Sequence, residues 1–125
     1  MVDLAPTLAE AAGLELPWYN QGKSLTDLLR GHSDTHRDSV RSEFFAAINF
    51  PDQTHATMYR DERWKLVSYH DKNLFELYDL QQDPWEHQDL SETPEHRELL
   101  LRLLSRSFDR QVAAAPPMPA RTAPF

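Results

Sequence analysis

The sequence contains no cysteine and only three glycines in 125 residues. Without cysteine the chain has no disulfide, no thiolate nucleophile and no zinc ribbon. Gly13, Gly22 and Gly31 are too widely spaced for a phosphate-binding loop or a dinucleotide fingerprint. No Asn-x-Ser/Thr triplet occurs either, so N-glycosylation is not expected. These absences exclude several common kinds of catalytic and cofactor site.

Positive charge and long apolar runs are also scarce. Lys and Arg number 13 against 20 Asp and Glu, and the resulting net charge of −7 argues against a nucleic-acid partner. Even the longest apolar runs are only a few residues, such as Leu99–Leu101 and Val112–Ala115, so no membrane-spanning helix is expected. The start Met1-Val-Asp-Leu4 has neither a basic residue nor an apolar stretch, and we expect no signal peptide in this chain. The size of 14.6 kDa fits one small domain.

The first 31 residues predict two short helices. Pro6 suits the first turn of a helix that stops at Gly13, where glycine allows a left-handed backbone. Ser24 is an acceptable N-cap for a second helix that ends at Gly31. The polar stretch that follows, up to Asp38, is typical of a loop.

The middle of the chain predicts an antiparallel meander. Four segments rich in β-branched and aromatic residues are separated by the loop Ile48–His55 and by two short turns. The expected strands are Ser39–Phe45, Thr57–Arg60, Trp64–His70 and Leu74–Leu80. Alternation places Trp64, Leu66 and Ser68 on the opposite face from Lys65, Val67 and Tyr69.

A C-terminal helix is expected from Pro94 to Gln111. A hydroxyl residue, a proline and a carboxylate stand together at Thr93-Pro94-Glu95, as at many helix starts. Leu100, Leu104, Phe108 and Val112 recur every four residues and predict the stripe that covers the sheet. The fold class is therefore α+β: a three- to four-stranded antiparallel meander covered by a C-terminal helix and preceded by short N-terminal helices.

No group of residues in this pattern forms a strong catalytic or metal motif. His32 and His36 have a helical spacing but lie in a polar loop with no third ligand, so solvated side chains are the simpler interpretation. Asp79, Asp83 and Glu86 lack the glycine and the terminal Glu of an EF-hand. Ser68, His70 and Asp79 have the residue types of a catalytic triad, but the sequence has no nucleophile elbow, so we expect ordinary strand or surface residues. We expect no catalytic residue and no metal site.

Short segments with characteristic residues are spaced along nearly the whole chain. They are Asp3-Leu-Ala-Pro-Thr7, Ala12-Gly-Leu14, Gln21-Gly-Lys-Ser-Leu25, Leu28-Leu-Arg-Gly31, Arg41-Ser-Glu43, Met58-Tyr-Arg60, Trp64-Lys-Leu-Val67, Leu77-Tyr-Asp-Leu80 and Asp83-Pro84 with Glu86. In their order and gaps these segments resemble the late part of the sulfatase family, of the arylsulfatase-like kind. The proline-rich tail Pro116–Phe125 resembles the end of bacterial members of that kind. One departure is Asp89-Leu90, where such sequences often have Asn-Leu, because Asp accepts hydrogen bonds but lacks the amide donor.

The resemblance implies chemistry that this chain does not carry. Complete sulfatases use a divalent cation, usually calcium, and a formylglycine made from the Cys or Ser of a Cys/Ser-x-Pro-x-Arg motif. This chain has no Cys, and none of its prolines follows a Ser at the required spacing. We therefore expect no cofactor in this chain and no sulfatase activity from it alone.

Two functional hypotheses follow. In the first, the chain is the C-terminal part of a sulfatase-like sulfuric ester hydrolase, which stabilises the fold and shapes the substrate cleft of a missing catalytic domain. Residues 1–31 are then a remnant of the catalytic-domain edge, 32–115 the C-terminal subdomain and 116–125 a proline-rich tail, from a bacterial cytoplasmic or periplasmic parent. In the second hypothesis the chain is a free-standing interaction or oligomerisation module.

Two residues are the predicted contacts to the substrate rim. His55 could donate a hydrogen bond to a sulfate oxygen, and Arg60 could pair with an anion. The simpler alternative is that His55 is an ordinary loop residue and that Arg60 pairs with Glu43.

The N-terminal segment also predicts association. If the catalytic domain is missing, its large apolar side chains lack their usual neighbours, and a homodimer would cover them about a two-fold axis. These side chains are Leu4, Leu8, Leu14, Leu16 and Trp18.

Overall fold

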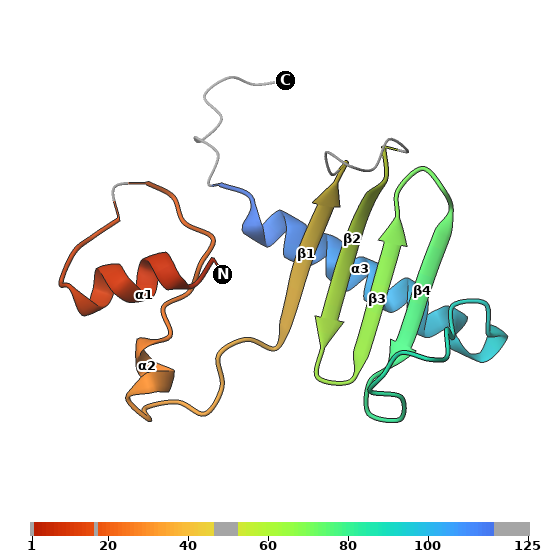
Figure 1. Ribbon diagram of the computed structural model, residues 1–125, viewed down its shortest axis with the longest axis horizontal. Helices are drawn as coiled ribbons and strands as arrows, with labels where there is room; N and C mark the ends of the chain where they lie inside the picture. The colour runs from red at the N-terminus through yellow and green to blue at the C-terminus, as the bar shows by residue number, and fades with distance from the viewer. Residues whose placement is uncertain (1, 17, 47–52, 117–125) are drawn as a thin grey trace, which may run out of the picture. The chain divides into compact units, whose positions relative to one another are not determined.

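The computed structural model describes residues 2–16, 18–46 and 53–116 (Figure 1). Its chain divides into two compact units, one made of residues 1–36 with 113–125 and the other of residues 37–112. In the described segments, no helix is both long enough and apolar enough to cross a membrane.

The first unit contains two short helices, α1 (Leu4–Ala11) and α2 (Thr26–Leu29). The buried Thr7 links them, since its Oγ1 donates to the Asp3 carbonyl at 2.5 Å and accepts from the Leu25 amide at 2.9 Å. Gly13 and Gly31 follow the helices with φ of +67° and +71°, as expected for helix stops. Pro6 stands in the first turn of α1, where no amide hydrogen is needed.

The second unit is built on a four-stranded antiparallel sheet in the order β1-β2-β3-β4. The strands are β1 (Ser39–Phe45), β2 (His55–Asp61), β3 (Trp64–Tyr69) and β4 (Leu74–Asp79). The expected meander is confirmed. The expected loop Ile48–His55 lies partly outside the described residues, and its last residue begins β2, which pairs His55 with Phe45.

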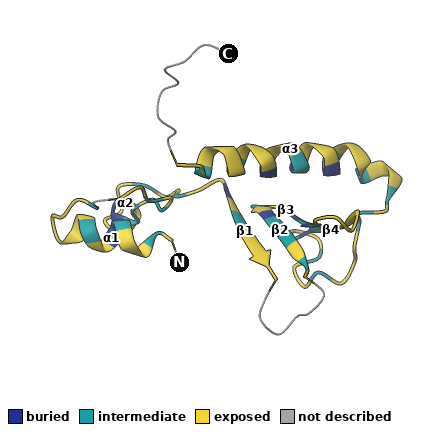
Figure 2. Cartoon of the chain, turned by 90° about the horizontal axis from the view of Figure 1, so that it is seen from above, coloured by how far each residue is buried: buried dark blue, intermediate teal, exposed yellow. Residues whose placement is uncertain are grey.

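The helical layer is formed by the 3-10 turn Pro94–His96 and by α3 (Arg97–Ala114). Figure 2 shows α3 lying over one face of the sheet. Between the two layers the core contains the buried side chains Tyr59, Leu66, Leu77, Leu100 and Leu103. This arrangement confirms the expected α+β class, with Leu66 and Ser68 facing the helix as alternation predicted.

The expected apolar stripe of the helix was wrong in its second half. Phe108 and Val112 are 64% and 60% exposed, whereas Leu100, Leu103 and Ser107 are buried. A step of four residues advances about 40° beyond a full turn, because an α-helix has 3.6 residues per turn. A stripe taken strictly at that step therefore rotates away from the sheet, and a small polar residue, Ser107, takes the contact position.

An ion pair closes the end of the sheet where β4 stops. Asp79 is 4% exposed and accepts from Arg63 at 3.1 Å through Nε and 2.7 Å through Nη2. The same carboxylate accepts the backbone amides of Gln81 and Gln82 and so fixes the following turn. The hydrogen bond from Arg63 is the main reason that the pKa of Asp79 is held below its usual value.

The corrected helix face predicts a contrast between two leucines of α3. Leu103→Ala should lower the free energy of unfolding by about 2–4 kcal/mol, because it opens a cavity in the core. Leu101→Ala, at a site 60% exposed, should change it by less than about 0.5 kcal/mol. Urea unfolding followed by circular dichroism measures both, and equal losses would contradict the assigned face.

The ion pair predicts a pH dependence of stability. Because the folded pKa of Asp79 lies below the ordinary value of 3.8, its contribution is complete above that pH and is lost as the pH falls through the folded pKa. Asp79→Asn should cost about 2 kcal/mol at neutral pH, and the difference from the wild type should shrink below pH 3.8. The exposed Glu92→Gln is the matched control; a mutant difference that is constant with pH would refute the assignment.

Candidate functional site

A groove opens between the sheet and α3 because the core ends after one apolar row. Tyr59, Leu66 and Leu77 are neighbours across three strands and form that row. In the next row toward the β3–β4 turn, Thr57 and Ser68 take the corresponding positions on β2 and β3. Opposite them the helix presents the buried Ser107. Small polar side chains on both layers leave a groove of about 480 Å³.

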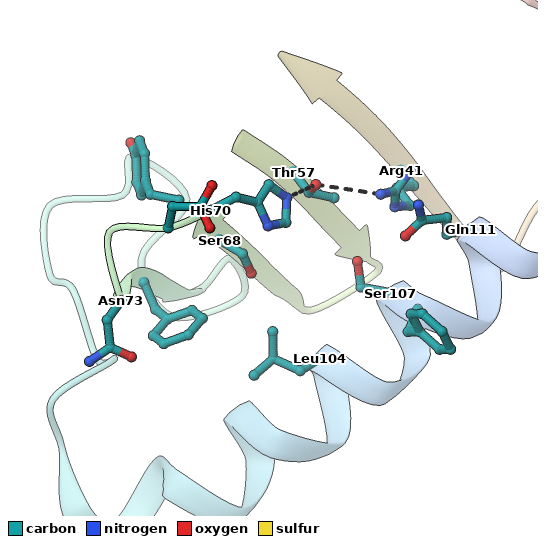
Figure 3. A pocket seen from close by; sticks show the side chains of 12 residues that line it. Arg41, Thr57, Ser68, His70, Asn73, Leu104, Ser107 and Gln111 are labelled. Carbon is teal, nitrogen blue, oxygen red and sulfur yellow. Dashed lines mark hydrogen bonds between the residues drawn. The ribbon is translucent and has the colours of Figure 1, made fainter. Parts of the chain in front are cut away.

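Residues from all parts of the sheet–helix unit line this groove. Figure 3 shows Thr57 between His70 and Arg41, with Ser107 and Gln111 projecting from α3 on the other side. The lining residues are Arg41, Thr57, Ser68, Tyr69, His70, Asp71, Asn73, Phe75, Leu104, Ser107, Phe108 and Gln111.

A hydrogen-bonded chain runs along the polar side of the groove. Thr57 Oγ1 lies 2.6 Å from His70 Nε2 and accepts from Arg41 Nη2 at 3.4 Å. Arg41 can only donate, so Thr57 Oγ1 accepts from it, and the same hydroxyl can either donate to His70 Nε2 or accept from it, according to the tautomer of the ring. Arg41 also pairs with Glu43, while its buried Nε atom has no hydrogen-bond partner among the described residues.

The two predicted rim residues lie far apart. His55 begins β2, its carbonyl accepts from the His70 amide at 2.8 Å, and its ring meets Phe45 edge to face with centroids 5.4 Å apart. Arg60 is five positions later, which places it on the other face of the sheet and about 16 Å along the strand. The alternative for Arg60 was a pair with a carboxylate such as Glu43, and Glu43 pairs with Arg41 in the structure.

The weaker motifs are not assembled into sites. Ser68 and His70 share the groove, but Asp79 is bound to Arg63 at the other end of β4. His32 lies 3.7 Å from Asp27. His36, by contrast, lies 3.2 Å from Asp3. In the described segments, no three His, Asp or Glu side chains come together as metal ligands.

The face of the sheet away from α3 is a second notable surface. No described helix or strand of residues 37–112 lies over it (Figure 2), although most of its side chains are apolar or aromatic. Val40, Phe44 and Leu74 are exposed there. The alternating positions on this outer face are Val40, Ser42, Phe44, Ala56, Met58, Arg60, Lys65, Val67, Tyr69, Leu74, Glu76 and Tyr78.

A polar cluster stands on the β3–β4 side of this outer face. Tyr69 and Tyr78 both donate to Glu76, at 2.8 Å and 3.1 Å. The hydrogen bond to Glu76 raises the pKa of Tyr69, and burial is the main cause that raises the pKa of Tyr78 to about 12. Both tyrosines therefore remain neutral donors at physiological pH.

The loop after β4 is held to the sheet by its carboxylates. Glu86 pairs with Lys65 at 2.5 Å, and Asp89 Oδ1 accepts the Leu77 amide at 2.9 Å. The Asp at position 89, where similar sequences often have Asn, thus serves as an acceptor, for which no amide is needed. Trp85, immediately before the first of these anchors, is 80% exposed.

Sequence reasoning had missed the groove and the outer face. Arg41, Thr57 and Ser107 were not selected, because each is an ordinary strand or helix residue in the sequence. The available signal was the presence of Thr57 and Ser68 at alternating positions that face the core, where apolar residues were expected.

The fold and the quoted segments together define the class: a small α+β subdomain of the sulfatase type. The sequence matches the family described as N-sulphoglucosamine sulphohydrolase, C-terminal, over residues 1–112. The chain belongs to this family and is a sulfatase C-terminal subdomain.

Two curated relatives from Bacteroides thetaiotaomicron support this membership. A Delta 4,5-hexuronate-2-O-sulfatase is 35% identical over 116 residues, which covers 86% of this chain and 24% of the relative. An N-acetylglucosamine-6-O-sulfatase is 32% identical over 89 residues, covering 68% of this chain and 16% of the relative. The chain therefore spans a quarter or less of these relatives and contains no counterpart of their catalytic domain.

Solved structures show the same fold. A 2-O GAG sulfatase superposes with a TM-score of 0.79 at 31% identity over 90% of this chain and 24% of its own. A phosphonate monoester hydrolase of Agrobacterium radiobacter reaches 0.77 at 24% identity, covering 90% of this chain and 25% of its own, which shows a shared fold alone.

The groove network predicts an effect of removing one hydroxyl. Thr57→Val should lower the free energy of unfolding by about 1–2 kcal/mol, because the buried hydroxyl of Thr57 loses its hydrogen bonds to Arg41 and His70. It should also change the tautomer balance of the His70 ring, measured by nitrogen-15 NMR. Ser42→Val, on the outer face of β1, is the control and should leave the His70 signals unchanged; an unchanged ring in Thr57→Val would contradict the network.

Proposed function

We propose that this subdomain completes a sulfuric ester hydrolase by docking its outer sheet face on the catalytic domain and by forming part of the substrate-cleft rim. The observation that carries the proposal is an apolar sheet face in a chain that spans about 24% of its relative's length. The substrate class proposed for the complete enzyme is a sulfated sugar, after the sulfatases of hexuronate and N-acetylglucosamine named among its relatives.

The outer face has the properties of a docking surface. A contiguous apolar patch on a sheet is a favourable place for burial against another domain. Met58 and Val67 pair directly at its centre and are half-buried. The neighbouring cluster of Tyr69, Tyr78 and Glu76 offers a polar rim, as is usual around an apolar interface.

The end of the sheet near His55 supports the rim role. The last residues of β1, the first residues of β2 and the β3–β4 turn stand at this end, and loops on a rigid sheet commonly carry binding residues. His55 keeps its proposed role as a donor to a sulfate oxygen. Arg60 shares the outer face with Met58, and we propose that it faces an acidic group of the catalytic domain, or a bound anion at that boundary.

The catalytic chemistry is proposed to reside in the other domain. The formylglycine and the divalent cation that the sulfatase resemblance implies have no ligand set or precursor motif in this chain. The role of these 125 residues is then to position and stabilise.

A chimera tests this proposal. Replacing the C-terminal quarter of the Delta 4,5-hexuronate-2-O-sulfatase with this chain should give a soluble enzyme that hydrolyses its sulfate ester, while the isolated chain shows no turnover. Val67→Lys should abolish the chimera's activity, because it places a charge in the docked face. Leu101→Lys, on the exposed side of α3, should leave the activity within about twofold.

The proposed role of His55 in the substrate-cleft rim is tested in the same chimera. His55→Ala should raise KM with little change in kcat, since the side chain is proposed to bind substrate rather than to react. Activity that survives Val67→Lys but fails with Leu101→Lys would show docking through the helix and would overturn the proposed face. Turnover by the isolated chain would overturn the assignment of catalysis to the missing domain.

A second function, self-association, is favoured by one observation. In the first unit Leu4, Leu8, Leu14 and Trp18 are exposed, and Leu16 is half-buried. We propose a homodimer through this segment as the alternative role. A dimeric mass in static light scattering, lost in Leu8→Ser, would support it; a monomer near 14.6 kDa would reject it.

A further inference from the structure

We propose that the groove between the sheet and α3 is a binding subsite for one uncharged sugar residue; this inference rests on the proposed function for its ligand class. The groove is lined by residues of this chain's sheet, its β3–β4 turn and α3. Its volume of about 480 Å³ falls within the range of roughly 300–1,000 Å³ that small-molecule sites occupy.

The polar side of the groove matches the hydroxyls of a sugar. Thr57 and Ser107 are buried and bring hydroxyl groups, while Asn73 and Gln111 bring amides that both donate and accept. Each sugar hydroxyl also donates and accepts, so it can bind such side chains in either direction. Thr57 already pairs with Arg41 and His70, so Ser107, Asn73 and Gln111 are the polar groups that remain for a ligand.

Arg41 supplies the most specific observation. Its Nε atom is buried and has no hydrogen-bond partner in the described part of the chain, although buried N–H groups are normally paired. The side chain lines the groove, next to Thr57. The guanidinium beside the groove therefore has incomplete hydrogen bonding among the described residues.

The apolar wall matches the C–H face of a sugar ring. Phe75, Leu104 and Phe108 line the same groove. Phe108 is 64% exposed on α3, so its ring is available to a ligand at little cost in core packing. An aromatic ring presents a negative face to the weakly positive C–H bonds of a pyranose.

The balance of charge selects an uncharged ligand. Arg41 is already paired with Glu43, and Asp71 stands among the lining residues. A sulfate or carboxylate group would therefore meet as much negative as positive charge, which removes its electrostatic advantage.

The test is an NMR titration of the full 125-residue chain, labelled with nitrogen-15. N-acetylglucosamine is the uncharged probe, and N-acetylglucosamine 6-sulfate and inorganic sulfate are the charged ones. Shifts should be confined to the groove residues and should saturate with N-acetylglucosamine. Phe108→Ala should weaken binding about fivefold, the loss expected for one stacking contact.

Two further variants make the result specific. Ser107→Leu should fill the groove and block binding, with circular dichroism to confirm folding. Leu101→Ala, another exposed apolar residue of α3, is the matched control and should bind with unchanged affinity.

Three outcomes would overturn the inference. They are tighter binding of the sulfated sugar, competition by inorganic sulfate, and no shift at the groove up to the solubility limit of N-acetylglucosamine. If N-acetylglucosamine causes no shift at the groove residues while the sulfatase chimera is active, only this inference fails. If sugar binds and the chimera is inactive, the docking proposal fails and the subsite stands.

Discussion

The contact between one row of the sheet and one side of α3 is the interaction on which the rest of this subdomain depends. Leu66 and Leu77 from the sheet and Leu103 from the helix are almost completely buried, and they provide most of the tight packing between the layers. Burying a leucine stabilises a fold by about 1.5–3 kcal/mol, so a few such residues account for much of the stability of a small domain. Beyond this row the two ends of the sheet differ. A polar groove lies toward the β3–β4 turn, and the ion pair of Arg63 and Asp79 lies at the opposite end.

The two faces of the sheet differ in a way that fits a subdomain of a larger enzyme. The inner face is covered by the chain's own helix. The outer face contains Met58, Val67 and their apolar neighbours, and the two tyrosines that donate to Glu76 form a polar edge beside them. A domain of this size gains little from exposing an apolar sheet to water, so an interface is the physical explanation we favour.

The groove and the outer face make separate demands on the same four strands. Alternation sends Thr57 to the helix side and Met58 to the other, so neighbouring residues of β2 serve different surfaces. One strand can thus anchor a docking face and line a ligand site without compromise between them. The same rule separates His55 from Arg60, which the sequence had grouped as one rim.

The sequence by itself determined the strands, the helix stops at Gly13 and Gly31, the α+β class and the family resemblance, because these depend on local propensity and on residue order. It did not determine which side of α3 meets the sheet. With 3.6 residues per turn, apolar residues spaced by three and by four positions define two different faces, and only packing against the sheet distinguishes them. Only the tertiary structure decided that Ser107 and Thr57 line one groove and that Arg41 pairs with Glu43. Those contacts depend on strand register and on the distance between layers, which no local pattern encodes.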